Sequence, residues 1–182
     1  MKAGVVPQHG RLEVIEMPRP EPGPFDCLVR IDACATCAGT DTNIINGTFP
    51  WMEKPPFVLG HESTGIIIEL GEKVQNFEKG QRVTRPCGVL PGDRIDGIGS
   101  NCGGYAEYGL VRDCGAAEAA GEECGGMLQS SRFPLPPDVD YVSAALSINQ
   151  REILSVVRRV EVEPGMGVAV IGSGYNGLLF AL

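Results

Sequence analysis

Short apolar stretches, each ended by glycine or proline, run from the N-terminus to residue 111 and limit what this chain can fold into. The chain has 25 glycines and 14 prolines, and both residues interrupt helices and favour turns. In residues 27–33, apolar side chains alternate with Arg30 and Asp32, as in a strand with one buried face. This half of the chain is therefore predicted to be mostly β. The strands are expected at residues 2–6, 11–16, 27–33, 63–70, 81–85 and 105–111.

A different pattern begins after Pro136. The segment DYVSAALSINQREILSVVRRV has apolar residues at helical spacing and few breakers, which predicts one or two helices that end before Pro164-Gly165. Residues 168–171 then form a continuous apolar run, typical of a strand buried on both faces in a parallel sheet. Between these two halves, residues 113–132 are rich in Gly, Ala and Glu, and we expect a surface loop there.

Composition excludes several classes of partner. The chain has 15 Lys and Arg against 23 Asp and Glu, and its net charge of −8 repels nucleic acid and anionic lipid. No apolar stretch approaches the roughly 20 residues that span a bilayer, and the N-terminal residues lack the apolar core of a signal peptide. We therefore expect no membrane and a cytoplasmic location. Seven cysteines without a regular spacing then predict some metal ligands, with the others buried as small apolar residues.

A glycine motif follows the apolar run. Residues 172–177, GSGYNG, spell G-x-G-x-x-G at a strand-to-helix junction, the context in which this motif binds a dinucleotide. Gly172 would permit the tight turn, Gly174 would let a pyrophosphate approach the backbone, and Gly177 would let the helix pack on the strand. A plain glycine-rich turn is the alternative. Because one strand and half a helix cannot bury their own faces, the motif predicts about 150 further residues in the intact protein.

A second constellation combines a thiol, an imidazole and a carboxylate. Cys37 lies in CATCAGTD, and His61-Glu62 lies in PPFVLGHESTG, at the start of an apolar stretch. These are ligand types that zinc accepts, so all three residues are candidate ligands. Two other interpretations stay open: Cys37 and His61 could be a core residue and a turn residue, or Cys34 and Cys37 could form a redox pair.

The chain resembles the zinc-dependent medium-chain alcohol and polyol dehydrogenases, which include sorbitol, threonine and glucose dehydrogenases. The resemblance runs through VRIDACATCAGTD, PPFVLGHESTGIIIELGEKVQNFEKGQRV, CGGYAEYGLV, FPLPPDVDYVSAAL and VAVIGSGYNGLL, in that order. It implies a mostly β fold with helices: a GroES-like β-barrel catalytic domain over residues 1–145, followed over residues 146–182 by a linking helix and the incomplete start of a Rossmann α/β domain.

The resemblance also implies roles for particular residues. Cys37 and His61 match the first two ligands of a catalytic zinc, and Glu62 matches a carboxylate that binds the metal or lies beside it. Thr40 matches the hydroxyl that begins a proton relay from the substrate alcohol, and Asp41 would hold the zinc site in place. A third protein ligand is expected at Gln150 or Glu152. Gly172, Gly174 and Gly177 would bind NAD or NADP.

The sequence departs from the family pattern at three places. Ala38 is inserted between Cys37 and Gly39, and Asn43 replaces the histidine of the proton relay. The run of closely spaced cysteines that binds a structural zinc is missing, so one catalytic Zn²⁺ and no structural zinc is expected. Phe49, Trp51 and Phe57, between the ligand segments, are candidates for the substrate pocket or for the core.

The expected function is a zinc-dependent oxidoreductase that transfers a hydride between a small alcohol or polyol and a nicotinamide cofactor. The intact enzyme is expected to be a homo-oligomer, dimeric or tetrameric, and the 182 residues alone are expected to be inactive. Two alternatives are a zinc-free reductase of the same fold and a non-catalytic GroES-like binding module.

Overall fold

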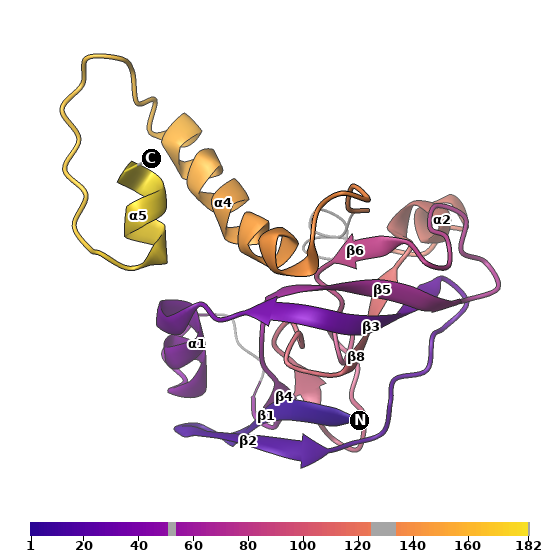
Figure 1. Ribbon diagram of the computed structural model, residues 1–182. Helices are drawn as coiled ribbons and strands as arrows, with labels where there is room; N and C mark the ends of the chain where they lie inside the picture. The colour runs from indigo at the N-terminus through magenta and orange to yellow at the C-terminus, as the bar shows by residue number, and fades with distance from the viewer. Residues whose placement is uncertain (51–53, 125–133, 182) are drawn as a thin grey trace. The chain divides into compact units, whose positions relative to one another are not determined.

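The chain divides into two compact units, Met1–Ala145 and Leu146–Leu182. The structure, a computed structural model, describes residues 1–50, 54–124 and 134–181 (Figure 1). All strands found in these residues belong to the first unit. None of the helices in the described ranges is both long enough and apolar enough to cross a membrane.

The first sheet has the strand order β2-β1-β4-β7. β1 (Lys2–Gln8) and β2 (Arg11–Glu16) form an antiparallel hairpin whose turn contains Gly10 at φ +81°. β4 (Phe57–Val58) pairs antiparallel with β1, and β7 (Gly99–Ser100) pairs parallel with β4. Phe57 and Val58 are fully buried, so this short strand contributes to the core as well as to the sheet.

The second sheet has the strand order β6-β5-β3-β8. The long strand β3 (Asp26–Ala35) pairs antiparallel with β5 (Glu62–Leu70) on one side and β8 (Tyr108–Arg112) on the other. β6 (Arg82–Thr84) completes the sheet beside β5. A Cβ at Gly65 would lie 2.1 Å from the carbonyl oxygen of Arg30, so the close approach of β5 to β3 requires glycine there.

One segment, residues 104–108, connects the two sheets. Ala106 bridges to Ala3 of β1, and the Gly4 N–H donates to the Tyr105 carbonyl oxygen at 2.6 Å. On its other side, the Glu107 carbonyl oxygen accepts from the Ile31 N–H of β3 at 2.9 Å. The two sheets are thereby joined through a shared backbone segment.

The apolar side chains pack in clusters against each sheet. Val29 of β3 is fully buried and Ile31 is half-buried, whereas Arg30 and Asp32 face solvent, which confirms the predicted alternation over residues 29–33. Residues 26–29, in contrast, are all buried. The cluster on this sheet is formed by Cys27, Val29, Ile67, Val83 and Val111. Burial of each large apolar side chain of this kind contributes about 1.5–3 kcal/mol.

The prediction of a mostly β fold with helices is confirmed. A strand lies at or beside each of the six predicted ranges. The last of them begins at Tyr108 instead of residue 105, because before it Ala106 makes one isolated bridge to Ala3 of β1 instead of a continuous ladder. Two features were not predicted: the two-residue strands β4 and β7, and helix α1 (Ala38–Ile45).

The prediction of a surface loop over residues 113–132 is wrong for its first part. Helix α2 (Cys114–Ala119) begins there, capped by the Asp113 carboxylate, which accepts from the Ala116 N–H at 3.1 Å. Cys114 and Cys124 form a disulfide instead of remaining separate small apolar residues. Both half-cystines are buried with Phe25. Residues 125–132 of the predicted loop lie outside the described residues.

The predicted strand at residues 168–171 is also wrong. The described residues there form no strand, and Ile171 is fully exposed. A strand needs a neighbour to pair its backbone groups, and no strand of the second unit offers one within the residues described. The predicted helical segment is a single helix, α4 (Tyr141–Arg159), and the chain beyond residue 171 forms the short helix α5 (Tyr175–Ala181).

Candidate metal centre

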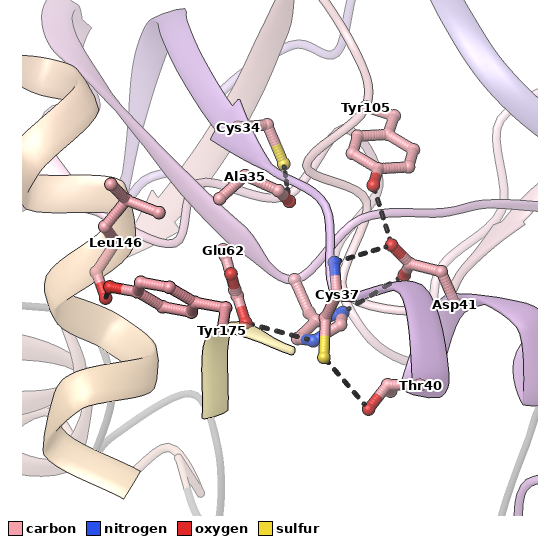
Figure 2. A network of polar contacts seen from close by, with 10 residues as sticks. Cys34, Ala35, Cys37, Thr40, Asp41, Glu62, Tyr105, Leu146 and Tyr175 are labelled. Carbon is pink, nitrogen blue, oxygen red and sulfur yellow. Dashed lines mark hydrogen bonds and ion pairs between the residues drawn. The ribbon is translucent and has the colours of Figure 1, made fainter. Parts of the chain in front are cut away.

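Cys37 lies where the longest strand passes into a helix. β3 ends at Ala35, and Cys37 is the N-cap residue of α1. Its side chain makes no capping hydrogen bond, so the sulfur is not engaged by the helix backbone. The Asp41 carboxylate satisfies the Cys37 N–H instead, with Oδ2 at 3.1 Å (Figure 2). The thiol therefore lies just beyond the C-terminal end of β3, at the N-terminus of α1.

The strand register brings His61 and Glu62 to the same place. Glu62 is the first residue of β5 and pairs with Ala35, the last residue of β3. Gly60, at φ +95°, turns the chain into β5, a conformation that a residue with a side chain adopts at a cost. The end of β3 and the start of β5, which are distant in sequence, thus lie side by side at the same edge of the second sheet.

The three candidate ligand residues form one cluster. One ligand atom each of Cys37, His61 and Glu62 lies within 4.8 Å of the other two. Glu62 is 2 % exposed, and its Oε1 lies 3.7 Å from the His61 Nε2. One thiol, one imidazole and one carboxylate are a donor set that zinc accepts, and their spacing allows them to converge on one ion. The residues present therefore fit a zinc ion.

Asp41 lies on the Nδ1 side of the His61 imidazole. Its Oδ1 faces the His61 Nδ1 at 3.4 Å, and neither atom has a hydrogen-bond partner of ordinary geometry. Burial by itself would raise the pKa of Asp41, but the facing His61 imidazole and the hydrogen bonds from Tyr105 and the Cys37 backbone outweigh it and lower the pKa. Asp41 is thus a carboxylate at neutral pH, and with His61 Nδ1 facing it, Nε2 is the nitrogen directed away from it.

Thr40 lies beside the thiol despite the inserted Ala38. The Cys37 S–H donates to the Thr40 Oγ1 at 3.3 Å (Figure 2). Cys37 is the N-cap and Thr40 lies in the first helical turn, and side chains three residues apart meet on one helix face. The insertion therefore does not separate the hydroxyl from the thiol. Asn43, at the position of the missing histidine, is exposed.

Cys34 is close to the cluster but does not belong to it. Its S–H donates to the Ala35 carbonyl oxygen at 3.7 Å. Burial raises the pKa of the Cys34 thiol to about 12, so it remains protonated at neutral pH. A protonated thiol is neither a good nucleophile nor a good metal ligand, which disfavours the interpretation of Cys34 and Cys37 as a redox pair.

The glycine motif and the two expected third ligands belong to the second unit. Gly172 has φ +127°, and a Cβ at Gly177 would lie 2.0 Å from the Gly172 carbonyl oxygen, whereas Gly174 faces open space. The Gln150 Nε2 lies 3.5 Å from the Tyr175 hydroxyl within the same unit. The assignment of these glycines to a cofactor, and of Gln150 or Glu152 to zinc, stays a prediction.

The aromatic candidates differ in their environment. Phe57 is fully buried in a core cluster with Val6, Ile44 and Leu59, and Phe49 is 39 % exposed. Trp51 lies outside the described residues. An open cavity of about 450 Å³ lies against β1, β2 and residues 104–107. The candidate metal ligands Cys37, His61 and Glu62 do not line it.

Tyr105 is the site residue that sequence reasoning missed. Its hydroxyl donates to the Asp41 Oδ2 at 2.7 Å across a separation of 64 residues (Figure 2). The preceding Gly103-Gly104 pair was the available signal, because glycines before an aromatic residue allow close backbone approach. Glycine pairs are common in turns, however, and the partner of Tyr105 follows only from the fold.

Comparisons with known proteins agree on one family. The family described as the alcohol dehydrogenase GroES-like domain matches residues 23–120, more than half of the chain. Among curated proteins, an alcohol dehydrogenase of Rhizobium meliloti is 31 % identical over 97 % of this chain and 52 % of its own length. A sorbitol dehydrogenase of Halalkalibacterium halodurans is 32 % identical over 100 % of this chain and 52 % of its own length.

Solved structures give the same result. A protein from Sinorhizobium meliloti, described as a zinc-binding dehydrogenase and bound to NADP, is 33 % identical with a TM-score of 0.74, covering 98 % of this chain and 51 % of that one. The 2R,3R-butanediol dehydrogenase of Bacillus subtilis, at 23 % identity and a TM-score of 0.74, covers 98 % of this chain and 53 % of that one and shares the fold. The chain thus spans about half the length of these relatives.

Proposed function

This chain belongs to the alcohol dehydrogenase GroES-like domain family, and we propose that it is the zinc-binding part of an oxidoreductase that transfers a hydride between an alcohol or polyol and NAD or NADP. The observation that carries the proposal is the cluster of Cys37, His61 and Glu62 at one edge of the second sheet. Names of the relatives support it, since they include alcohol and sorbitol dehydrogenases.

Cys37 and His61 would hold the zinc ion, with Glu62 binding it or lying beside it. Gln150 and Glu152 remain the candidates for a further protein ligand. Zinc bound there would supply a Lewis acid that polarises the alcohol oxygen and favours its loss of a proton. Every other part of the site would then serve to orient these ligands or to move that proton.

Thr40 is the residue proposed to receive the proton. Its hydroxyl lies 3.3 Å from the Cys37 sulfur, and a hydroxyl can accept and donate at the same time. The buried Asp41 carboxylate would keep the His61 Nδ1 protonated, so that the Nε2 lone pair is available to the metal. Because Asn43 cannot titrate, water or the cofactor ribose would continue the relay beyond Thr40.

The second unit is proposed to begin the cofactor domain. Support comes from the positive φ of Gly172, from the contact that excludes a Cβ at Gly177, and from the open backbone at Gly174. The NADP bound to the Sinorhizobium meliloti protein supports a nicotinamide cofactor. Because the relatives are about twice as long, hydride transfer is assigned to a protein that also has the rest of this cofactor domain.

The test is the zinc content of the purified chain after dialysis, measured by elemental mass spectrometry for the wild type, Cys37→Ser and Cys34→Ser. We expect one zinc per chain in the wild type and in Cys34→Ser, and loss of the metal in Cys37→Ser. Cys34 is the matched control, because it is a neighbouring half-buried thiol outside the cluster. A wild-type chain that binds no zinc would favour the zinc-free reductase.

A further inference from the structure

We propose that Tyr105 is a positioning residue of this site: its hydroxyl fixes the Asp41 carboxylate, which in turn selects the His61 tautomer that presents Nε2 to a metal ion. The proposal deepens the proposed function and rests on it only where zinc affinity is concerned. The polar contacts run from the Tyr105 hydroxyl to Asp41, from Asp41 to the His61 imidazole, and from His61 to the cluster with Cys37 and Glu62.

The first step is that the two carboxylate oxygens of Asp41 have different partners. Oδ2 accepts two hydrogen bonds, from the Tyr105 hydroxyl at 2.7 Å and from the Cys37 N–H at 3.1 Å. These two donors come from different segments, so together they fix the plane of the carboxylate. Oδ1 is left facing the His61 Nδ1 at 3.4 Å. With the Tyr105 hydroxyl removed, only one donor would hold Oδ2, and the carboxylate could rotate away from His61.

The second step is the rigidity of Tyr105 itself. Its N–H donates to the Leu59 carbonyl oxygen at 2.8 Å, and its carbonyl oxygen accepts from the Gly4 N–H. A Cβ at Gly60 would lie 2.6 Å from Cδ1 of the tyrosine ring, so the ring rests directly on the backbone that leads into His61. The segment that presents His61 therefore also holds the residue that orients it.

The third step is the protonation of the tyrosine. Burial and the hydrogen bond to Asp41 raise the pKa of Tyr105 above its ordinary value near 10. The hydroxyl therefore donates throughout the pH range in which a dehydrogenase works. A neutral imidazole carries its proton on one nitrogen. The fixed Asp41 Oδ1 faces Nδ1 at 3.4 Å, whereas the Glu62 Oε1 lies farther from Nε2, at 3.7 Å, so the proton is placed on Nδ1 and Nε2 stays available to a metal ion.

The experiment reads the histidine tautomer in the metal-free protein. The chain has two histidines, and His9 is exposed, so ¹⁵N-histidine labelling gives one reporter and one internal reference. Long-range ¹H–¹⁵N correlation spectra at about pH 8 distinguish protonated from unprotonated ring nitrogens. For the wild type we expect His61 to be a single Nδ1–H tautomer and His9 to be an average of both. In Tyr105→Phe, the His61 signals should move toward the average.

Zinc affinity, measured by competition with a chromophoric chelator, is the second readout. Loss of a group that orients a metal ligand typically weakens binding about 10–100-fold, and we expect Tyr105→Phe to weaken zinc binding by at least about tenfold. Tyr108→Phe is the matched control, because Tyr108 lies three residues away with its ring against Arg19. If Tyr105 acts through Asp41, adding Tyr105→Phe to Asp41→Asn should cause little further loss.

Three results would overturn the proposal. One is a wild-type His61 protonated on Nε2, a measurement that does not depend on any variant folding. Another is a folded Tyr105→Phe protein with an unchanged tautomer. The last is additive losses of zinc affinity in the double variant. If the wild type shows the Nδ1–H tautomer and the variant loses it, while neither binds zinc, the orienting role stands and the proposed zinc function fails.

Discussion

The Asp113 carboxylate offers a direct test of how this fold is stabilised away from the metal site. It is 1 % exposed and accepts four hydrogen bonds. Oδ2 accepts from the backbone N–H groups of Gln75 and Asn76, both at 2.8 Å, and Oδ1 accepts from the Asn76 side chain and from the Ala116 N–H. One carboxylate therefore caps α2 and anchors residues 75–76 beside it.

We expect Asp113→Ala to lower the free energy of unfolding by about 3–5 kcal/mol. Loss of the helix cap contributes about 1 kcal/mol. Each of the two further backbone N–H groups, at Gln75 and Asn76, would lose its buried acceptor at a cost of about 1–3 kcal/mol. Entry of water into the space left by the carboxylate would reduce the sum, which is why the lower half of the range is used.

Urea denaturation followed by far-ultraviolet circular dichroism measures this loss. Asp140→Ala is the control, because Asp140 caps the start of α4 in the same way through the N–H groups of Val142 and Ser143, but it is exposed. Its loss should be clearly smaller. Equal losses in the two variants would refute the argument that the buried acceptor, rather than the cap alone, stabilises this region.

The same residue predicts a pH dependence. Burial alone would raise the pKa of Asp113, but its hydrogen bonds with Asn76, Gln75 and Ala116 outweigh that effect and lower the pKa in the folded state. A lowered folded-state pKa means that the stabilisation is complete above the unfolded value of about 3.9 and is lost as the pH falls through the folded-state pKa. The stability difference between wild type and Asp113→Asn should therefore be largest at neutral pH and shrink below about pH 4. A constant difference down to acid pH would contradict this sign.

Two further predictions concern the backbone around the site and the disulfide. Gly60→Ala should destabilise the fold by about 1–3 kcal/mol more than Gly80→Ala. The two glycines have similar positive φ values, +95° and +87°, but only at Gly60 would a Cβ meet the Tyr105 ring. Equal urea midpoints for the two variants would show that the ring moves aside without cost. Replacing both Cys114 and Cys124 by alanine should lower the free energy of unfolding by about 3 kcal/mol, because the cross-link closes a short loop in the unfolded chain. Thermal melts with and without reductant check this, and a wild type that melts identically in both conditions would contradict it.

The mostly β architecture could be predicted from the sequence because its signals are local. Alternation around Arg30 and Asp32 marks a half-buried strand, and glycine or proline marks where such strands end. Helix α1 escaped prediction because AGTDTNII is short and poor in strong helix formers. Its start is supported by the Asp41 side chain, which reaches back to the Cys37 N–H. The apolar run at residues 168–171 led to a wrong strand prediction for the opposite reason. Its local signal was strong, but no partner strand pairs with it among the described residues.

The sequence by itself determined the chemical types at the candidate metal centre: a thiol at residue 37, an imidazole at 61 and a carboxylate at 62, in segments with a family resemblance. Only the tertiary structure decided that these groups meet, through the pairing of Ala35 with Glu62. It also decided that Tyr105, 64 residues from Asp41, completes the support of His61. The physical reason is that residue types and periodicity are written locally along a chain, whereas strand register joins distant segments and places side chains within hydrogen-bonding distance only once the sheets have formed.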